Sequence, residues 1–574
     1  MFMDFTVPVP VLKGRVFIKK VRGFRYVHYQ YDSVYDPVRK YANPKRTTIG
    51  KIDESDPSKM FPNPSYYKFF PDEQLPELSS SVRSSCLKVG SYIVISKIIH
   101  EYLLQPVIHE IIGKKYGLFL DLMAYVIVCE NNAGQYYPDY AYNHPLFTED
   151  MKIYSDSSIS DFLHSITVDD SVAFLNAWNE KQDHRSKIYI SYDSTNKKSQ
   201  AGDIDCIEVG HSKEGIPDTI FNYSIAYDTN NRVPLFYEQY PGSITDITQL
   251  QQMIEKAKSF GYRNVGFILD RGYFCKENIR YMDANRYSFI IMMKGMKSLV
   301  KQIVKEVSGT FEKTWSERIK EYSVNGTTLQ RKLFPSDEKD RYFHIYYSDY
   351  KAALEKDDLS QTLDQMEGFM KEHQGEQIEL SSSYDHYFDL VYWHKGQKDQ
   401  KFMTGVPKEE VIAESLSLCG YFVIITSEKM SAKEALLLYK SRDDSEKLFR
   451  GDKSYLGNKS NRTYSNESFR SKIFIEFAAL IVRNKIYTSL TEKMKEDGKR
   501  NYMSVPAAIR ELEKIEMIRY GNSVYKLDHA LSKVQKHILA AFDIDADYMK
   551  KQLASLSIGL EAIEKQYGKK SDND

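Results

Sequence analysis

The chain has 574 residues, more than one hydrophobic core usually supports, so several structural units are expected. Apolar residues make up 42% and charged residues 28%, which excludes a collagen-like chain, a small disulfide-stabilised protein and a largely disordered one. No apolar run reaches the roughly 18 residues that cross a bilayer, and the N-terminus lacks the pattern of a signal peptide. The five scattered cysteines, without a C-x2-C pair, favour reduced thiols in a cytoplasm.

Charge is unevenly distributed along a chain whose net charge is zero, with 79 basic and 79 acidic residues. Residues 1–60 hold twelve Lys and Arg against six Asp and Glu, and residues 453–485 hold seven against two. The stretch 355–376 is acidic and offsets them. A chain coated with basic residues is therefore excluded. Separate basic segments favour several phosphate-contacting surfaces, although solvated helix faces give the same pattern.

The first third of the chain changes from a β pattern to a helical one. Short alternating runs within residues 14–54 predict strands, and five prolines within 55–80 predict a linker. Apolar residues at helical spacing follow in 88–130 and 155–185. We therefore expect a β-rich N-terminal segment with its linker at 1–80, followed by a helical region at 81–185.

The central region has the most regular pattern. A strand over 187–193 ends on Asp193, and two strands, 219–227 and 233–240, are joined by the hairpin-like DTNNR. A helix over 246–261, a strand over 264–270 ending on Asp270, a further helix and the strand SFIIMMKG follow. The order β-β-β-α-β-α-β predicts a ribonuclease H-like mixed sheet, because a doubly wound sheet alternates from its start.

The rest of the chain interrupts this pattern and then resumes it. Residues 297–418 are interpreted as an insertion domain, after which GYFVIIT at 420–426 predicts another core strand. A long helix is expected from about Ser431 to Phe449, and more helices over 468–496 and 503–555. The predicted fold class is thus α/β, with a ribonuclease H-like core at 186–296 and 419–490 and a helical C-terminal region at 491–574.

Two aspartates, Asp193 and Asp270, each end a predicted strand of the same sheet. Carboxylates at neighbouring strand ends converge and offer hard oxygen ligands to divalent cations. A third carboxylate from a helix would complete a two-metal site of the kind that activates an attacking oxygen and stabilises a leaving one. Taken singly, an aspartate at a strand end is more often a turn or cap residue.

The predicted helix after residue 431 carries an unusual polar stripe. Tyr439, Arg442, Glu446 and Lys453 are separated by three, four and seven residues, which places them within about 60° of one another around a helix. A phenol, a guanidinium, a carboxylate and an ammonium group on one stripe suit a polyanion held near a metal. An exposed i, i+4 ion pair between Arg442 and Glu446 explains part of the same pattern.

The motif Tyr439-x2-Arg442-x3-Glu446-x6-Lys453 resembles the YREK signature of bacterial insertion-sequence DDE transposases. Similar segments surround it: YDST at Asp193, GHSKEGIPD, PLFYEQYPGSITD, ILDRGYF at Asp270, and RSKIFIEFAALIV. The resemblance covers about 187–490. The chain departs from the family at Asp443, Asp444 and Ser445, where bulky apolar residues are usual, and this added negative charge would oppose the approach of DNA.

The resemblance implies an activity and a set of roles. Asp193, Asp270 and Glu446 would be catalytic and would bind two Mg²⁺ ions, or Mn²⁺ in their place. Tyr439, Arg442 and Lys453 would hold the phosphates of the transposon ends, and the helical region 81–185 would bind DNA. Lys213 and Arg271 are further candidates for phosphate contacts, although Arg271 could instead pair with a neighbouring acid. The activity would be strand cleavage and strand transfer at insertion-sequence ends, by a homodimer on double-stranded DNA that carries the inverted repeats and on target DNA. A cytoplasmic protein of the bacterial nucleoid, without a membrane, is expected.

Several alternatives stay open from the sequence. A catalytically impaired or domesticated relative could bind DNA as a regulator, although the presence of all three acids favours an active enzyme. A two-carboxylate glycosidase is a separate class, against which the basic segments and the YREK stripe argue. His211 is expected to be a hydrogen-bonded loop residue, and Trp315 and Trp393 either pack or stack on a flipped base. Nucleotide-binding glycine motifs are absent, so no nucleotide cofactor is expected.

Overall fold

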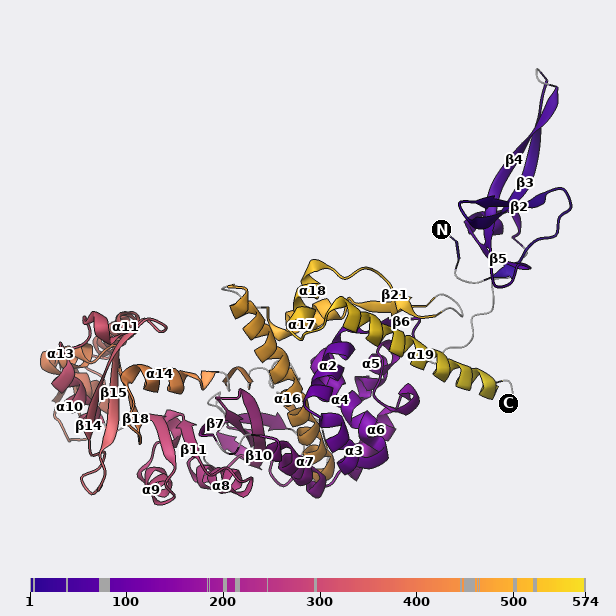
Figure 1. Cartoon of the computed structure of the whole chain (residues 1–574). Helices are drawn as coiled ribbons and strands as arrows, with labels where there is room; N and C mark the ends of the chain where they lie inside the picture. Colours follow the sequence, from indigo (N-terminus) through magenta and orange to yellow (C-terminus); the bar gives the residue numbers. More distant parts are fainter. Residues whose placement is uncertain are drawn as a thin grey trace. The chain divides into compact units, whose positions relative to one another are not determined.

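The computed structural model describes most of the chain, and the chain divides into two compact units (Figure 1). The first unit contains residues 1–174, 454–458 and 465–574, and the second contains 175–453 and 459–464. The described residues are 2–3, 6–37, 40–71, 83–182, 184, 186–199, 204–211, 217–244, 246–293, 297–443, 446–448, 460–461, 463, 465–498, 503–519 and 524–571. In these ranges no helix is both long and apolar enough to cross a membrane.

The N-terminal residues form a small antiparallel sheet, which confirms the β pattern predicted for 14–54. Its strand order is β1-β5-β4-β3-β2, with β1 (Val7–Pro8), β2 (Val16–Val21), β3 (Phe24–Asp36), β4 (Tyr41–Ile52) and β5 (Lys59–Pro62). The predicted linker instead contains β5 and the helix α1 (Pro64–Phe69), which begins where the Asn63 side chain accepts hydrogen bonds from two backbone N–H groups. Tyr66 of α1 is buried with Val27 and Ile49 in the core of this sheet.

The remainder of the first unit is mainly helical, as predicted for 88–130 and 155–185. Its elements are α2 (Gly90–Glu101), α3 (Leu104–Ile112), α4 (Tyr116–Cys129), α5 (Tyr137–Asn143), α6 (Asp156–Ser165), the first part of α7 (Val168–Glu180), α16 (Asn466–Glu496), α17 (Val505–Leu512), α18 (Lys533–Ala540) and α19 (Ala546–Ser571). A three-stranded sheet, β21-β20-β6, joins β6 (Cys86–Lys88) to β20 (Glu516–Ile518) and β21 (Lys526–Leu527). Strands this short carry no detectable alternation, so the sequence did not predict this sheet.

Helix α16 is the central element of this helical body. It packs against α4 and α6, and the ring of Phe474 lies 4.9 Å from that of Phe119 and 5.1 Å from that of Phe174. Buried residues occur on every side of α16, as expected of a helix that is enclosed by its neighbours. The predicted catalytic core included residues 468–490, which here belong to this helix of the first unit.

The second unit is built on one eleven-stranded mixed sheet with helices, so the α/β class is confirmed. The strand order along the sheet is β10-β9-β7-β11-β12-β18-β15-β14-β13, with β19 (Ser460–Asn461) beside β7 and β8 (Glu208–His211) beside β9. The first part has the predicted element order: β7 (Ile188–Ser199), β9 (Pro217–Asp228), β10 (Val233–Pro241), α8 (Asp246–Ser259), β11 (Val265–Leu269), α9 (Lys276–Ala284) and β12 (Ser288–Met292). Strands β7, β11 and β12 run parallel to one another.

The insertion at 297–418 contributes strands to this same sheet. Strand β18 (Tyr421–Thr426) pairs with β15 (Arg341–Tyr347), and the sheet continues through β14 (Val324–Arg331) and β13 (Arg318–Ile319). Apolar residues that face one another across β15 and β18, such as Ile345 and Val423, explain this pairing. The other elements of the insertion are α10 (Lys297–Val307), α11 (Asp349–Glu372), α12 (Ser382–Tyr387), α13 (Glu409–Ser417) and the hairpin β16 (Phe388–Trp393) and β17 (Lys401–Pro407).

Two predicted element boundaries were wrong. Strand β7 continues to Ser199 beyond Asp193, because residues 193–198 pair with β9 and the buried Lys197 ammonium lies 4.1 Å from the ring centre of Tyr223. Helix α14 (Ala432–Lys440) starts where predicted, with a capping box formed by Ser431, but the predicted helix is interrupted after Lys440, and residues 443 and 446–448 are helical again. A turn follows at 441–442, where the Ser441 hydroxyl donates to the Leu438 carbonyl, and such local bonds compete with regular helix.

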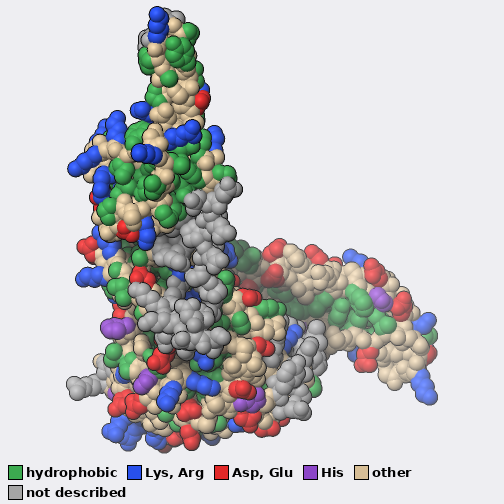
Figure 2. Space-filling model, turned by 90° about the vertical axis from the view of Figure 1, so that its right-hand side faces the viewer, with side chains coloured by type: hydrophobic (Ala, Val, Ile, Leu, Met, Phe, Trp, Pro, Cys, Tyr) green, Lys and Arg blue, Asp and Glu red, His purple; other side chains and the backbone are tan. Residues whose placement is uncertain are grey.

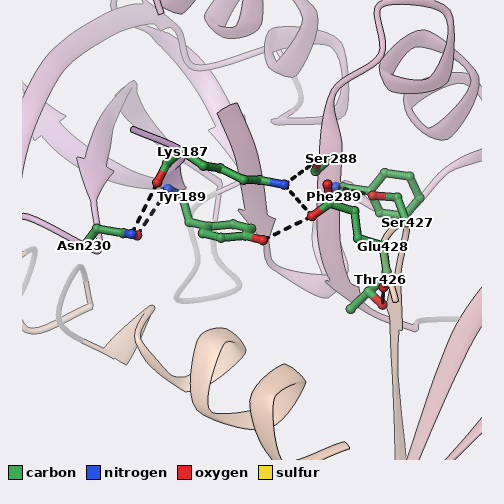
Figure 3. Close-up of polar contacts among 8 residues, drawn as sticks. All are labelled: Lys187, Tyr189, Asn230, Ser288, Phe289, Thr426, Ser427 and Glu428. Carbon is green, nitrogen blue, oxygen red and sulfur yellow. Dashed lines mark hydrogen bonds and ion pairs between the residues drawn. The ribbon is translucent and has the colours of Figure 1, made fainter. Parts of the chain in front are cut away.

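Strands β7, β12 and β18 are also linked by polar side chains at one edge of the sheet (Figure 3). The Lys187 ammonium, just before β7, donates to Ser288 of β12 over 2.9 Å and pairs with Glu428, just after β18. The Tyr189 hydroxyl donates to the same carboxylate over 3.2 Å. These contacts fix the strands relative to one another at the edge opposite to Asp193 and Asp270.

We expect Gly326→Ala to destabilise the second unit. A Cβ at this position of β14 would lie 2.7 Å from the ring of Tyr346, which is fully buried and donates to the Ala432 carbonyl at the start of α14. Overpacking of this kind costs about 1–3 kcal/mol of unfolding free energy. The control Gly368→Ala, at an exposed position of α11 with nothing within 4 Å of the new Cβ, should instead raise stability by up to about 1 kcal/mol. Thermal unfolding measures both changes: the melting temperature should fall for Gly326→Ala and rise for Gly368→Ala. Equal melting temperatures for the two variants would contradict the expectation.

Candidate active site

The two aspartates lie side by side because of the register between two parallel strands. The last residues paired between β7 and β11 are Tyr192 and Leu269, so Asp193 and Asp270 are the next residues on adjacent strands. Neighbouring strands are about 4.8 Å apart. Asp193 continues within β7, whereas Asp270 leaves the sheet as the cap of a short helical turn, η4 (Arg271–Tyr273), and accepts a hydrogen bond from the Arg271 N–H over 2.7 Å.

The sheet face that carries both aspartates is covered by α14. Side chains two residues apart in a strand share a face, so Asp270 lies on the same face as Ile268. Ile268 is fully buried in one cluster with Leu436 and Tyr439 of α14. The apolar side of α14 therefore packs on this face, and the residues that follow α14 lie near the aspartates.

Arg442 connects the end of α14 to two of the predicted catalytic acids. Its Nη1 atom lies 2.9 Å from Oδ1 of Asp270, and its Nη2 atom lies 2.5 Å from Oε1 of Glu446. Its guanidinium carbon is 5.3 Å from the ring centre of Tyr439, a buried residue one turn earlier. The Arg442 side chain is 13% exposed, while those of Asp270 and Glu446 are 39% and 48% exposed. One guanidinium thus holds two carboxylates at a partly open site.

The charges at this site affect one another strongly. Burial alone would lower the pKa of Arg442, but Tyr439 and the negative charges of Asp270, Glu446 and Asp193 raise it above its ordinary value. Burial raises the pKa of Tyr439 to about 12, so this residue is a neutral phenol at pH 7.

The predicted site residues are thus only partly accounted for. Asp270 and Glu446 pair with Arg442, and Asp193 lies beside Asp270 in the strand register, but the described part of the chain contains no group of three or more His, Cys, Asp or Glu side chains arranged to hold a metal. Arg271 is exposed, and its charge reaches Tyr439. The other predicted residues of this site lie outside the described residues: Lys453, Lys213 and Asp444.

Two further predictions concern residues away from this site. Trp315 is 73% exposed with the Arg318 guanidinium 5.5 Å from its ring centre, and Trp393 is 49% exposed and stacks on His394, so neither is a core residue. Of the basic segment 453–485, Lys472 and Arg483 are buried, with 8% and 7% exposure. Some of the basic residues of this segment that were predicted to face DNA are therefore buried in the protein.

Sequence reasoning missed the contact between Arg442 and Asp270. These residues are far apart in the chain, and the motif spacing indicated only that Arg442 and Glu446 share a helical stripe. Only an indirect indication of this contact was present in the sequence. The apolar positions of α14 predict that this helix packs on the sheet, and such packing places its last turn near a strand end.

Part of the chain matches a known protein family. Residues 210–482 match the family model described as "Transposase DDE domain", a range slightly under half of the chain that includes Asp270, Arg442 and Glu446 but not Asp193. No curated protein sequence matches. Among the solved structures that match is the cryo-EM structure of a piggyBac transposase synaptic complex with hairpin DNA, at 8% identity and a TM-score of 0.33, over 82% of this chain and 84% of that one.

Residues 210–482 are similar to a transposase DDE domain, and the function of the chain is that of a DNA transposase. This conclusion depends on the domain match and on the fact that the matched range contains Asp270, Arg442 and Glu446.

We expect Arg442→Lys to impair strand cleavage while DNA affinity stays nearly unchanged. Lysine keeps the positive charge but loses the planar fork that spans Asp270 and Glu446, so Glu446 is held less well. A tenfold lower cleavage rate at saturating DNA, equivalent to about 1.4 kcal/mol, is expected. Binding and cleavage titrations measured in parallel decide the matter. Lost affinity with an unchanged saturated rate would instead identify Arg442 as a phosphate clamp.

Proposed function

We propose that the chain cleaves DNA strands at the ends of an insertion sequence and transfers them to target DNA, with Asp193, Asp270 and Glu446 as its catalytic residues. The observation that carries this proposal is the position of Arg442, whose guanidinium pairs with Asp270 and Glu446, while the strand register puts Asp193 beside Asp270.

The same carboxylates have the chemistry of a divalent-metal site. Carboxylate oxygens are hard ligands of the type that Mg²⁺ and Mn²⁺ prefer, and those of Asp270 and Glu446 are partly exposed. Among the described residues these three side chains are not grouped to hold a metal, and we infer that they hold two such ions once they draw closer together. When bound, the ions would lower the barrier to phosphodiester cleavage by activating the attacking oxygen and stabilising the leaving oxygen.

Arg442 and Tyr439 act as positioning residues in this proposal. The buried Tyr439 ring supports the guanidinium, and the guanidinium aligns Asp270 with Glu446. A DNA phosphate is also a good bidentate partner for arginine, so DNA that enters the site competes with the carboxylates for Arg442. Lys453, Lys213 and Arg271 are proposed as further phosphate contacts.

The layout of the sheet supports a ribonuclease H-like catalytic core. Strands β10, β9 and β7 are antiparallel neighbours, and β11 and β12 continue from β7 in parallel. This is the arrangement expected from three consecutive strands followed by two helix–strand units. We propose in addition that the enzyme is of the bacterial YREK type, acts as a homodimer on inverted repeats and works at the nucleoid.

A second candidate function is a DNA-binding regulator that has lost catalysis. Asp443, which departs from the family pattern, supports this alternative: its side chain is 42% exposed, and its carboxylate lies 4.0 Å from the Lys440 ammonium. Such an exposed acid next to Arg442 would oppose a phosphate. The alternative predicts DNA binding without metal-dependent cleavage.

We expect Asp193→Asn, Asp270→Asn and Glu446→Gln each to reduce metal-dependent cleavage to the level without enzyme, while DNA binding is kept. Each change removes a charged oxygen ligand but preserves the shape of the side chain. The measurements are cleavage of a labelled duplex that carries the end of the element, with Mg²⁺ and with a chelator, and binding of the same duplex. If Glu446→Gln retained the full cleavage rate, the third carboxylate would have to come from elsewhere in the chain.

Asp443→Asn provides the matched control, because it removes an exposed acid one residue from Arg442. We expect it to retain the cleavage rate and to bind DNA as tightly as the unmodified protein or more tightly, since one negative charge near the phosphates is lost. A loss of cleavage as severe as that of Asp270→Asn would show that Asp443 belongs to the catalytic set. If the unmodified protein binds the duplex but never cleaves it, the regulator alternative holds.

A further inference from the structure

The N-terminal sheet has one face that is not used by its core. Val27 and Val16 face the core of the sheet, so their strand neighbours His28 and Phe17 face the other way. We call this second side, made of Phe17, Lys19, His28 and Arg46, the outer face. There the Phe17 ring stacks on His28 at 5.6 Å, and the Arg46 guanidinium lies 4.8 Å from the Phe17 ring centre. Rings and cations are therefore interleaved on a surface that no core residue covers.

The outer face is electrically positive. Partial burial lowers the pKa of His28, and the charges of Lys19 and Arg46 lower it further. Farther along, the Lys51 ammonium lies 3.8 Å from the ring centre of Phe24. The segment 11–51 as a whole holds eleven Lys and Arg against two Asp. Unlike Lys472 and Arg483, Lys19 and Arg46 are exposed.

Beyond the sheet, β3 and β4 continue together as a two-stranded ribbon. β2 pairs with β3 only up to Tyr29, and β5 pairs with β4 only from Gly50, so residues 32–36 and 41–45 pair solely with each other. We call these paired residues the ribbon extension. Its five residue pairs span about 17 Å. Its base is supported by Tyr31, whose ring stacks on Phe69 of α1 at 4.9 Å.

The ribbon extension exposes apolar side chains. Val34, Tyr35 and Tyr41 are 47%, 62% and 46% exposed, and Lys40 and Lys45 beside them are also exposed. Figure 2 shows the hydrophobic and basic side chains mixed along the projecting strands at the top of that view. An isolated two-stranded ribbon is only marginally stable in water, and exposed apolar groups on it commonly mark a binding surface.

We propose that the ribbon extension enters a groove of double-stranded DNA while cations of the outer face contact the phosphates beside that groove. The inference rests on the proposed function, which supplies DNA as the partner. The major groove is about 12 Å wide and 8.5 Å deep and admits a two-stranded β-ribbon, so a 17 Å extension reaches its floor. Tyr35 and Tyr41, which the strand register puts on opposite faces of the ribbon, then contact the two sides of the groove, and Lys19, Lys40 and Arg46 complement the phosphate charge.

Binding of the full-length protein to two labelled duplexes tests this inference. One duplex has mixed sequence and the other carries the end of the element, and each is titrated over a range of salt concentrations. We expect Lys19→Ala with Lys40→Ala to weaken binding to both duplexes and to lower the salt slope by about two. Tyr35→Ser with Tyr41→Ser should weaken binding to the element end by about tenfold or more, with an unchanged slope. Melting temperatures should stay unchanged, because all four side chains are exposed.

The matched control is Tyr350→Ser, which removes a 77% exposed tyrosine from α11 and should leave binding unaffected. If the unmodified protein binds and cleaves the element end, but both double variants bind as tightly as it does, the ribbon inference is wrong and the transposase function stands. If the unmodified protein binds neither duplex, both the ribbon inference and the proposed function fail. If it binds and the variants weaken binding, but nothing is cleaved, the ribbon inference stands and the catalytic proposal fails.

Discussion

The register between β7 and β11 is the constraint on which the candidate site depends. It places two carboxylates, Asp193 and Asp270, at adjacent positions of one sheet. At a separation of about 5 Å and an effective dielectric constant of about 20, two such charges repel each other by about 3 kcal/mol. The fold compensates by supplying Arg442 between Asp270 and Glu446. A site that concentrates negative charge in this way needs a compensating cation. The need is greater when DNA, itself a polyanion, enters the site.

The position of Arg442 follows from packing that has no direct part in the chemistry. The capping box at Ser431 starts α14, apolar residues such as Leu436 and Tyr439 fix it on the sheet, and the turn after Lys440 brings Arg442 to Asp270. Polar contacts of Lys187 and Glu428 link the same strands at the opposite edge. Buried apolar packing of α14 on the sheet therefore fixes the position of Arg442. The acids that Arg442 contacts can remain partly exposed, because the residues that position them are buried.

The sequence correctly predicted the helices and strands in which the spacing of apolar residues matches the face that is buried. The strand that ends at Asp270, the start of α14 at Ser431 and the helices of 88–130 were correct because local pattern and tertiary packing agree there. The end of the strand at Asp193 was wrong because β9 supplies partners for polar residues such as Lys197, and pairing of this kind overrides polarity. The link from Arg442 to Asp270 joins distant segments, so no local pattern contains it.

Charge is the property for which the sequence was least informative. Two basic segments have a similar excess, yet Lys472 and Arg483 of one are buried in a helical unit, while Lys19 and Arg46 of the other are exposed on an outer face. Counting charges cannot separate these cases, because a cation enclosed among protein groups no longer attracts phosphates at a distance. A chain with no net charge can therefore still bind a polyanion. What matters is which cations the fold leaves in solvent, and the N-terminal sheet leaves them beside exposed aromatic rings.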